Sequence, residues 1–201
     1  MATEKDQERA MALFRQAMNH QMAGELDESI RLYKESIALH PTADARTQLA
    51  MALIQQAMER QMAGDLNESI RLYKESIALC PTADAHTYLG WAYSFQGRID
   101  EAISQCEIAI QLDPEFGNPY NDIGVYLMQQ QKLDEAIPWL EKAKQARRYE
   151  PRHFPYLNLG RVYAAKGMLQ KALEEFRGAL ERHPGDADLT QLIEELETKL
   201  Q

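Results

Sequence analysis

Apolar residues recur three or four positions apart through most of the chain, which is the spacing of helices that bury one face. Ile70, Tyr73 and Ile77 follow this spacing in one segment, and Ala102 and Cys106 follow it in another. A proline closes each of five such segments, because proline cannot continue a helix and restrains the residue before it. These prolines are Pro41, Pro81, Pro114, Pro151 and Pro184. The pattern predicts an all-α chain with five helical hairpins.

The turn inside each hairpin is marked by a residue about three positions before the second helix. In four hairpins this residue is glycine, which adopts the left-handed conformation that ends a helix, and Gln131 takes the remaining slot. The glycines are Gly24, Gly64, Gly97 and Gly167. Polar residues follow the turns, and we expect their side chains to cap the second helices by accepting hydrogen bonds from free amides. They are Asp27, Asn67, Asp100 and Asp134.

Residues 11–50 and 51–90 are two copies of one 40-residue sequence, with 30 of the 40 positions identical. Self-similarity at a fixed period indicates stacked units, none of which can bury its apolar face alone. Chains of this kind usually bind other molecules rather than catalyse reactions.

Residues 87–114, TYLGWAYSFQGRIDEAISQCEIAIQLDP, carry the sharpest motif, and the two following hairpins repeat it. The matching residues are Leu89, Gly90, Tyr93, Gly97, Ala102, Ala109 and Pro114, then Ile123, Gly124, Ala136 and Ala143, then Leu159, Gly160, Tyr163, Gly167, Ala172, Phe176, Ala179 and Pro184. With these residues the chain resembles the tetratricopeptide repeat family, whose units are helical hairpins of about 34 residues. The resemblance implies a right-handed superhelical array of antiparallel helix-turn-helix repeats, with the first helices lining a concave groove.

The resemblance covers nearly the whole chain, so we expect one array over residues 1–201. Its repeats are expected at about 3–42, 43–82, 83–116, 117–152 and 153–186. Residues 187–200 carry one apolar stripe with charges elsewhere, which is typical of a helix that caps the open end of a stack. The stripe consists of Leu189, Leu192, Ile193, Leu196 and Leu200.

The second repeat has seven more residues than the third between its first-helix start and its turn, and its near-identity with the first repeat implies the same extension there. Seven residues turn a helix through nearly two full turns, so the buried face stays in phase within about 20° while the helix gains about 10 Å. We expect the two long helices to lie side by side. The extensions contain Met18, Met22, Met58 and Met62. These methionines either pack the extensions together or form an adaptable partner surface.

Residues 142–153 form a basic segment in an acidic protein. The cations are Lys142, Lys144, Arg147, Arg148 and Arg152, followed by His153. One interpretation is a solvated helix end, because cations complement the dipole of a helix C-terminus. The alternative is a docking site for an acidic peptide or a carboxylate terminus.

The family resemblance implies that first-helix side chains line the groove. These residues are Tyr88, Trp91, Phe95, Asn121, Asp122, Val125, Met128, Asn158 and Arg161. Asparagine amides can pair with a peptide backbone, aromatic rings supply contact area, and Arg161 could hold a carboxylate. The chain does not reproduce the lysine and asparagine set with which some members grip a two-carboxylate terminus, so that partner is not transferred. Each residue could equally serve packing.

Charge and composition restrict the classes of partner and activity that we expect. The formal net charge of −9 argues against nucleic acid and acidic membranes, which bind basic surfaces. The charged N-terminal residues and the absence of a long apolar run in the sequence predict a cytoplasmic location. Cys80 and Cys106 have no disulfide or metal-site spacing, and no histidine pattern predicts a metal. No cofactor, metal or catalytic motif is indicated, so we expect no enzymatic activity.

Two functions remain open. The first is a non-enzymatic scaffold that binds a peptide or helical segment of another protein in its groove. The second is a self-assembling protein, or one built by deliberate duplication, whose methionine-rich helices mediate association. Near-identical neighbouring repeats also favour the exchange of hairpins between chains, which predicts domain-swapped dimers.

Overall fold

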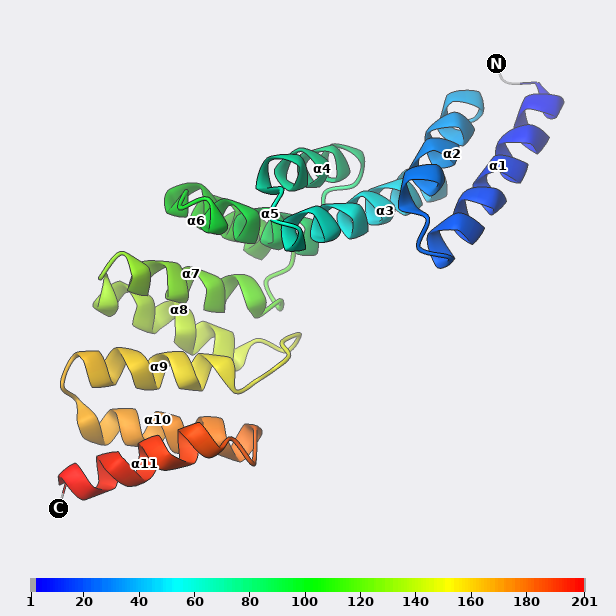
Figure 1. The fold of residues 1–201 in the computed structure, drawn as a ribbon. Coiled ribbons are helices and arrows are strands. Elements are labelled where there is room, and N and C mark those ends of the chain that lie inside the picture. Colours follow the sequence, from blue (N-terminus) through cyan, green and yellow to red (C-terminus); the bar gives the residue numbers. More distant parts are fainter. Residues whose placement is uncertain (1–2, 201) are drawn as a thin grey trace. The chain divides into compact units, whose positions relative to one another are not determined.

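The computed structural model describes residues 3–200, which form eleven α-helices in that range. Five first helices alternate along the chain with five second helices, and a final helix follows (Figure 1). The first helices are α1 (Glu4–Met22), α3 (Ala43–Met62), α5 (Ala83–Phe95), α7 (Asn118–Gln129) and α9 (Phe154–Ala165). The second helices are α2 (Leu26–Leu39), α4 (Leu66–Leu79), α6 (Ile99–Leu112), α8 (Leu133–Gln145) and α10 (Leu169–Arg182). The final helix is α11 (Ala187–Leu200).

The contacts divide the chain into two compact units, one ending at Arg98 and the other beginning at Ile99. In the first unit, α1 packs on α2 and α3 packs on α4, with α2 against α3 and α4 against α5. In the second unit, α7 packs on α8 and α9 packs on α10, with α6 against α7, α8 against α9 and α10 against α11. The order and packing confirm the predicted all-α repeat array.

The turn prediction is confirmed in every hairpin. Gly24, Gly64, Gly97 and Gly167 have φ values between 72° and 83°. Gln131 takes the same left-handed conformation with φ 62°, although it has a Cβ atom. A non-glycine residue pays a steric cost in this conformation, so the hairpin around Gln131 is held against a local preference.

The predicted caps are wrong in their register. The second helices begin one residue earlier than Asp27, Asn67, Asp100 and Asp134, at leucine or isoleucine, so these polar residues lie in the first helical turn. Helix α4 is capped by Asp65, whose carboxylate accepts from the Glu68 amide at 3.3 Å. Aspartate is favoured both at the cap and in the first turn, so the residue type alone does not fix the register.

The seven-residue extension is confirmed. Helices α1 and α3 have 19 and 20 residues, whereas α5 has 13. The phase is kept as well, because Ala10 and Ala17 are buried on α1 and Ala50 and Ala57 are buried on α3, each pair seven residues apart. Small buried residues thus continue the packing face into the extension.

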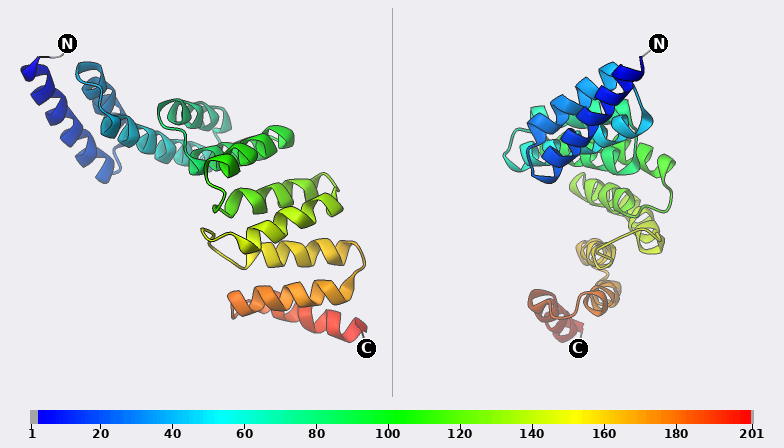
Figure 2. Two further views of the ribbon diagram at one scale, coloured as in Figure 1. Left: turned by 180° about the vertical axis from the view of Figure 1, so that it is seen from behind. Right: turned by 90° about the vertical axis from the view of Figure 1, so that its right-hand side faces the viewer.

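The long helices do not lie side by side along their length, contrary to expectation. Helix α1 packs mainly on α2, and its contacts with α3 are few. Helices α2 and α4 lie along opposite ends of α3 (Figures 1 and 2). The reason is geometric, since a second helix of 14 residues covers only part of a 20-residue partner. The extension therefore offsets successive hairpins along α3.

Helix α11 covers α10 as the predicted end of the array. Leu189, Ile193 and Leu196 of α11 are buried in one cluster with Leu173 and Phe176 of α10. The rest of its predicted stripe is more exposed, with Leu192 at 36% and Leu200 at 41%.

Candidate functional site

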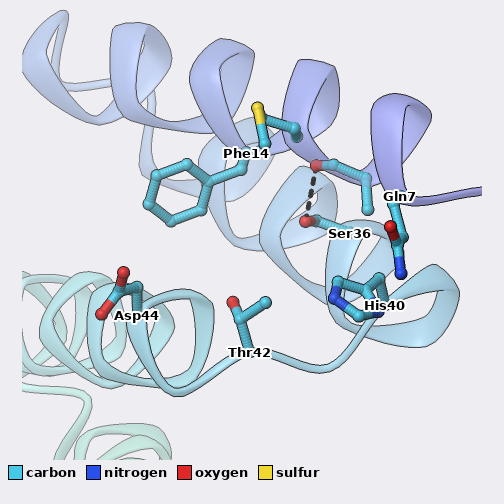
Figure 3. A pocket seen from close by; sticks show the side chains of 8 residues that line it. Gln7, Phe14, Ser36, His40, Thr42 and Asp44 are labelled. Carbon is cyan, nitrogen blue, oxygen red and sulfur yellow. Dashed lines mark hydrogen bonds between the residues drawn. The ribbon is translucent and has the colours of Figure 1, made fainter. Parts of the chain in front are cut away.

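A pocket of about 310 Å³ opens in the first unit between α1, the end of α2 and the start of α3 (Figure 3). Its lining residues are Gln7, Ala10, Met11, Phe14, Ser36, His40, Thr42 and Asp44. Gln7, Met11 and Phe14 are three or four residues apart on α1, so they project from one side of that helix. The pocket joins an apolar wall to a polar rim.

Local hydrogen bonds position the floor and rim of this pocket. The Ser36 hydroxyl donates to the Ala10 carbonyl at 2.8 Å, which joins α2 to α1 at a buried point. Thr42 caps α3, because its hydroxyl accepts from the Ala45 amide at 3.1 Å. The cap starts α3 so that Asp44 lies in its first turn, exposed to solvent. In Figure 3, Asp44 and Phe14 lie on the same side of the space.

Rows of methionine extend along α1 and α3 at spacings of seven and four residues. We call these residues the methionine face; they are Met11, Met18 and Met22 on α1 and Met51, Met58 and Met62 on α3. These spacings keep each row within about 20° of one line along its helix. All six side chains are exposed, between 38% and 84%. The four extension methionines therefore lie at the surface, and the structure offers no support for their packing the extensions together.

A hydrogen bond between side-chain amides joins the two helices that carry the rows. Gln21 Nε2 donates to Gln55 Oε1 at 2.8 Å, between α1 and α3. Gln21 also accepts from the Tyr33 hydroxyl at 2.9 Å, and Gln61 accepts from Tyr73 in the same way at 3.2 Å. These bonds hold the extended ends of α1 and α3 on their second helices. Burial raises the pKa of Tyr73 to about 12, which keeps its hydroxyl protonated as a donor.

Helix α5 carries the three aromatic residues that were expected to line the groove. The ring of Tyr88 stacks on Tyr73 with 6.1 Å between centroids, and Trp91 contacts Tyr88 edge-on at 5.3 Å. Phe95 is 67% exposed and precedes its turn glycine by two residues, as Met22 and Met62 do. The structure thus brings Tyr88 and Trp91 together and leaves Phe95 at the surface.

The predicted groove residues of the second unit fall into two groups. Asn121 of α7 and Asn158 of α9 are buried, and Asn158 Nδ2 donates to Asn121 Oδ1 at 2.9 Å. This bond joins two first helices. It also occupies amide atoms that were expected to pair with a peptide backbone. Arg161 is exposed and reaches Asn158 Oδ1 at 3.4 Å. Asp122, Val125 and Met128 are half-buried on α7.

The predicted basic segment is already compensated by nearby groups. Each of its cations is paired with a carboxylate or lies over an aromatic ring, as Lys142 over Trp139, Lys144 with Glu175 and Glu141, Arg147 with Glu115, Arg148 with Asp113 and Phe116, and Arg152 with Glu150. Lys144 is the most enclosed of the five, and its bond to Glu175 measures 3.0 Å. Hydrogen bonding and charge from Glu175 raise the pKa of Lys144 despite the opposing effect of burial. The segment therefore packs α8 and the following loop onto neighbouring acids.

Pocket residues Gln7, Met11, Phe14 and Asp44 were missed by sequence reasoning. One signal was available, because Met11 and Met51 precede Trp91 by 80 and 40 residues and occupy its slot in the first two repeats. Pocket formation itself depends on the packing of α1 against the start of α3, which periodicity does not give.

Three stretches of the chain, residues 11–43, 83–116 and 115–184, match models of the tetratricopeptide repeat. The chain belongs to the tetratricopeptide repeat family. Together with the helix order, these matches confirm the predicted family and fold class. Repeats of this family are typically interaction scaffolds and usually non-catalytic.

Solved structures show the same fold at low sequence identity. YrrB, described as a TPR protein with an unusual peptide-binding site, is 19% identical with a TM-score of 0.67, and the match covers 96% of this chain and 95% of YrrB. MamA is 23% identical with a TM-score of 0.66, covering 90% and 95%. PilF of Pseudomonas aeruginosa is 17% identical with a TM-score of 0.68, covering 98% and 86%. No curated protein sequence is significantly similar to the chain.

Two features of the described residues bear on other classes of function. Within residues 3–200, no group of three or more histidine, cysteine or acidic side chains could hold a metal ion. No helix in that range is long and apolar enough to cross a membrane.

Proposed function

We propose that this tetratricopeptide repeat protein is a non-enzymatic scaffold that binds a peptide or helical segment of another protein on its first helices. The observation that carries the proposal is the exposed methionine face, of which Met11 also lines the pocket of the first unit. Large apolar side chains rarely gather on a surface without a binding role, and methionine adapts to varied apolar partners. The peptide-binding site described for YrrB adds support by analogy.

The proposed contact residues differ between the units. In the first unit they are the methionine face together with Tyr88, Trp91 and Phe95. In the second unit they are Arg161, the exposed cation of α9, and the half-buried Asp122, Val125 and Met128 of α7. The partner is a protein rather than nucleic acid or membrane, because the net charge is −9. The cytoplasmic location stays a prediction.

Selection from a phage library of random 12-residue peptides, followed by amide NMR mapping, tests the proposal. Bound peptide should shift resonances of α1, α3 and α5 more than those of α2 and α4. The paired change Met22→Ser with Met62→Ser should weaken binding and leave the unfolding midpoint nearly unchanged, because both side chains are at least 80% exposed. Trp91→Ala and Arg161→Ala test the two units separately. Shifts confined to the second helices would contradict the proposal.

Self-association through the methionine face is the second candidate, since the same exposed side chains could meet those of another copy. A second copy is less suited to pack end to end against α1. Lys5 and Arg9 of α1 stand at the repeat positions that the buried Ala45 and Leu49 occupy in α3. Light scattering after size-exclusion chromatography distinguishes the candidates. A dimer that dissociates when both methionines are changed to serine would favour self-association. A monomer at all concentrations would contradict both self-association and domain swapping.

A further inference from the structure

We propose that the pocket between α1 and the start of α3 binds an arginine or lysine side chain of the partner. This inference rests on the proposed peptide binding and names the chemistry of one anchoring residue. Its basis is the composition of the pocket, the volume of the pocket and the lack of a bonding partner for the Asp44 side chain within residues 3–200.

The pocket combines one carboxylate with an apolar wall. Asp44 lies on its rim, and no lysine or arginine is among its eight lining residues. Phe14 and Met11 provide apolar surface in the lining, and Phe14 lies on the same side of the pocket as Asp44 (Figure 3). A long basic side chain suits such a site, because its methylene stem packs on apolar groups while its charged head stays near water and an acid. The ring of Phe14 adds an attractive face for a cation.

Asp44 is available for this role. Within residues 3–200 its side chain makes no ion pair and no hydrogen bond, although most acids of the first unit's second helices are paired with arginine or lysine. On α1, the Arg15 guanidinium donates from Nη2 to the Met11 sulfur at 3.3 Å. His40 is the other residue of the lining with an ionisable side chain.

Size also fits. A volume of about 310 Å³ lies at the lower end of the range for small-ligand pockets, roughly 300–1,000 Å³. That is suited to one side chain rather than to a folded segment. The rest of the partner would extend over the methionine face, which begins at Met11 in the pocket wall.

The internal duplication supplies a matched control. Asp84 occupies the slot of Asp44 in the next repeat, also in the first turn of a helix capped by threonine. Tyr88 follows it by one turn and stacks on Tyr73, whereas Gln48 stands at the corresponding position after Asp44. Likewise Ile54 corresponds to Phe14. The two acids therefore share their local helix effects but differ in their surroundings.

The test uses peptides selected from the random 12-residue library by the wild-type protein. Selected sequences should be enriched in arginine or lysine near apolar residues. For the tightest arginine peptide, Asp44→Asn should weaken binding about tenfold at low salt and less at high salt. Phe14→Ile should weaken it several-fold, and Asp84→Asn should leave it within about twofold. For an analogue with glutamine in place of the arginine, Asp44→Asn should change the affinity by less than about twofold.

The outcomes separate the two proposals. Selected peptides that bind the first helices without basic residues, or equal losses from Asp44→Asn and Asp84→Asn, would overturn the pocket assignment and leave the scaffold function standing. If the wild-type protein selects no peptide, both proposals are wrong. Thermal unfolding of each variant confirms that a loss of binding is not a loss of fold.

Discussion

Gln96 Nε2 donates a hydrogen bond to Asn67 Oδ1 at 2.8 Å, which joins the end of α5 to the first turn of α4. The same relationship recurs in other neighbouring repeats. Gln56 donates to Asp27, Gln130 donates to Asp100 at 2.8 Å, and Lys166 donates to Asp134. The residues that were expected to cap the second helices therefore form polar contacts between adjacent repeats. A partner 29 to 32 residues away takes the place of the local amide.

The contact between Lys166 and Asp134 should respond to salt, unlike the contacts between adjacent repeats that glutamine makes. Lys166→Met removes an ion pair of which Asp134 is largely exposed, so the loss should be at most about 0.5–1 kcal/mol and should shrink as salt screens the charges. Gln130→Met removes a bond from an amide to a carboxylate and should cost about 1 kcal/mol. Urea unfolding at low and high salt measures both. Equal salt dependence in the two variants would contradict the assignment.

Periodicity and punctuation were enough to predict the hairpins, because both reflect forces that act locally. The glycine slots, Gln131 included, and the seven-residue extension follow from helix geometry and turn conformation alone. The polar contacts between adjacent repeats could not be predicted in this way. The preference of aspartate for the start of a helix is satisfied whether it caps the helix or lies in its first turn, and the choice is made by Gln130 or Lys166 from the next repeat.

The candidate site was predicted unevenly for the same reason. Helix spacing placed Met18 and Met22 in one row, but whether that row was covered depended on the offset between hairpins. Asn121 and Asn158 were expected to face a ligand, whereas the structure bonds them to each other across α7 and α9. Contacts between repeats decide such cases, and a single repeat's sequence does not contain them.

Exchanging the turn residues of two hairpins should have opposite effects on stability. Gly97 has φ 75° with nothing near the position of a Cβ, so Gly97→Gln should cost about 1 kcal/mol through backbone conformation alone. Gln131 is exposed with φ 62°, so Gln131→Gly should stabilise by up to about 1 kcal/mol. Urea midpoints of the two variants give the signs. A Gln131→Gly variant less stable than wild type would show that the side chain contributes more than its strain costs.

Close packing at Gly160 should make even a methyl group destabilising. A Cβ atom there would lie 2.4 Å from Cε1 of Phe176, a ring buried between α9 and α10. Gly160→Ala should therefore cost about 1–3 kcal/mol by overpacking. Phe176→Leu in the same chain should recover part of the loss, because the smaller side chain leaves room for the methyl group. Calorimetric unfolding of the single and double variants tests this coupling, and additive losses would argue against it.

The stability of the second unit should fall as the pH drops below about 6.5, because of His153. Its ring stacks on His183 with 4.6 Å between centroids and lies 4.3 Å from Phe154. Burial and the neighbouring His183 lower the pKa of His153, while Asp186 acts in the opposite direction. The folded state thus binds fewer protons than the unfolded state, whose histidine titrates near 6.5. The contribution is complete above pH 6.5 and is lost as the pH falls through the folded-state pKa. Imidazole NMR should place the pKa of His153 below 6.5, and His183→Gln should raise it. An unchanged value in that variant would leave burial as the sole cause.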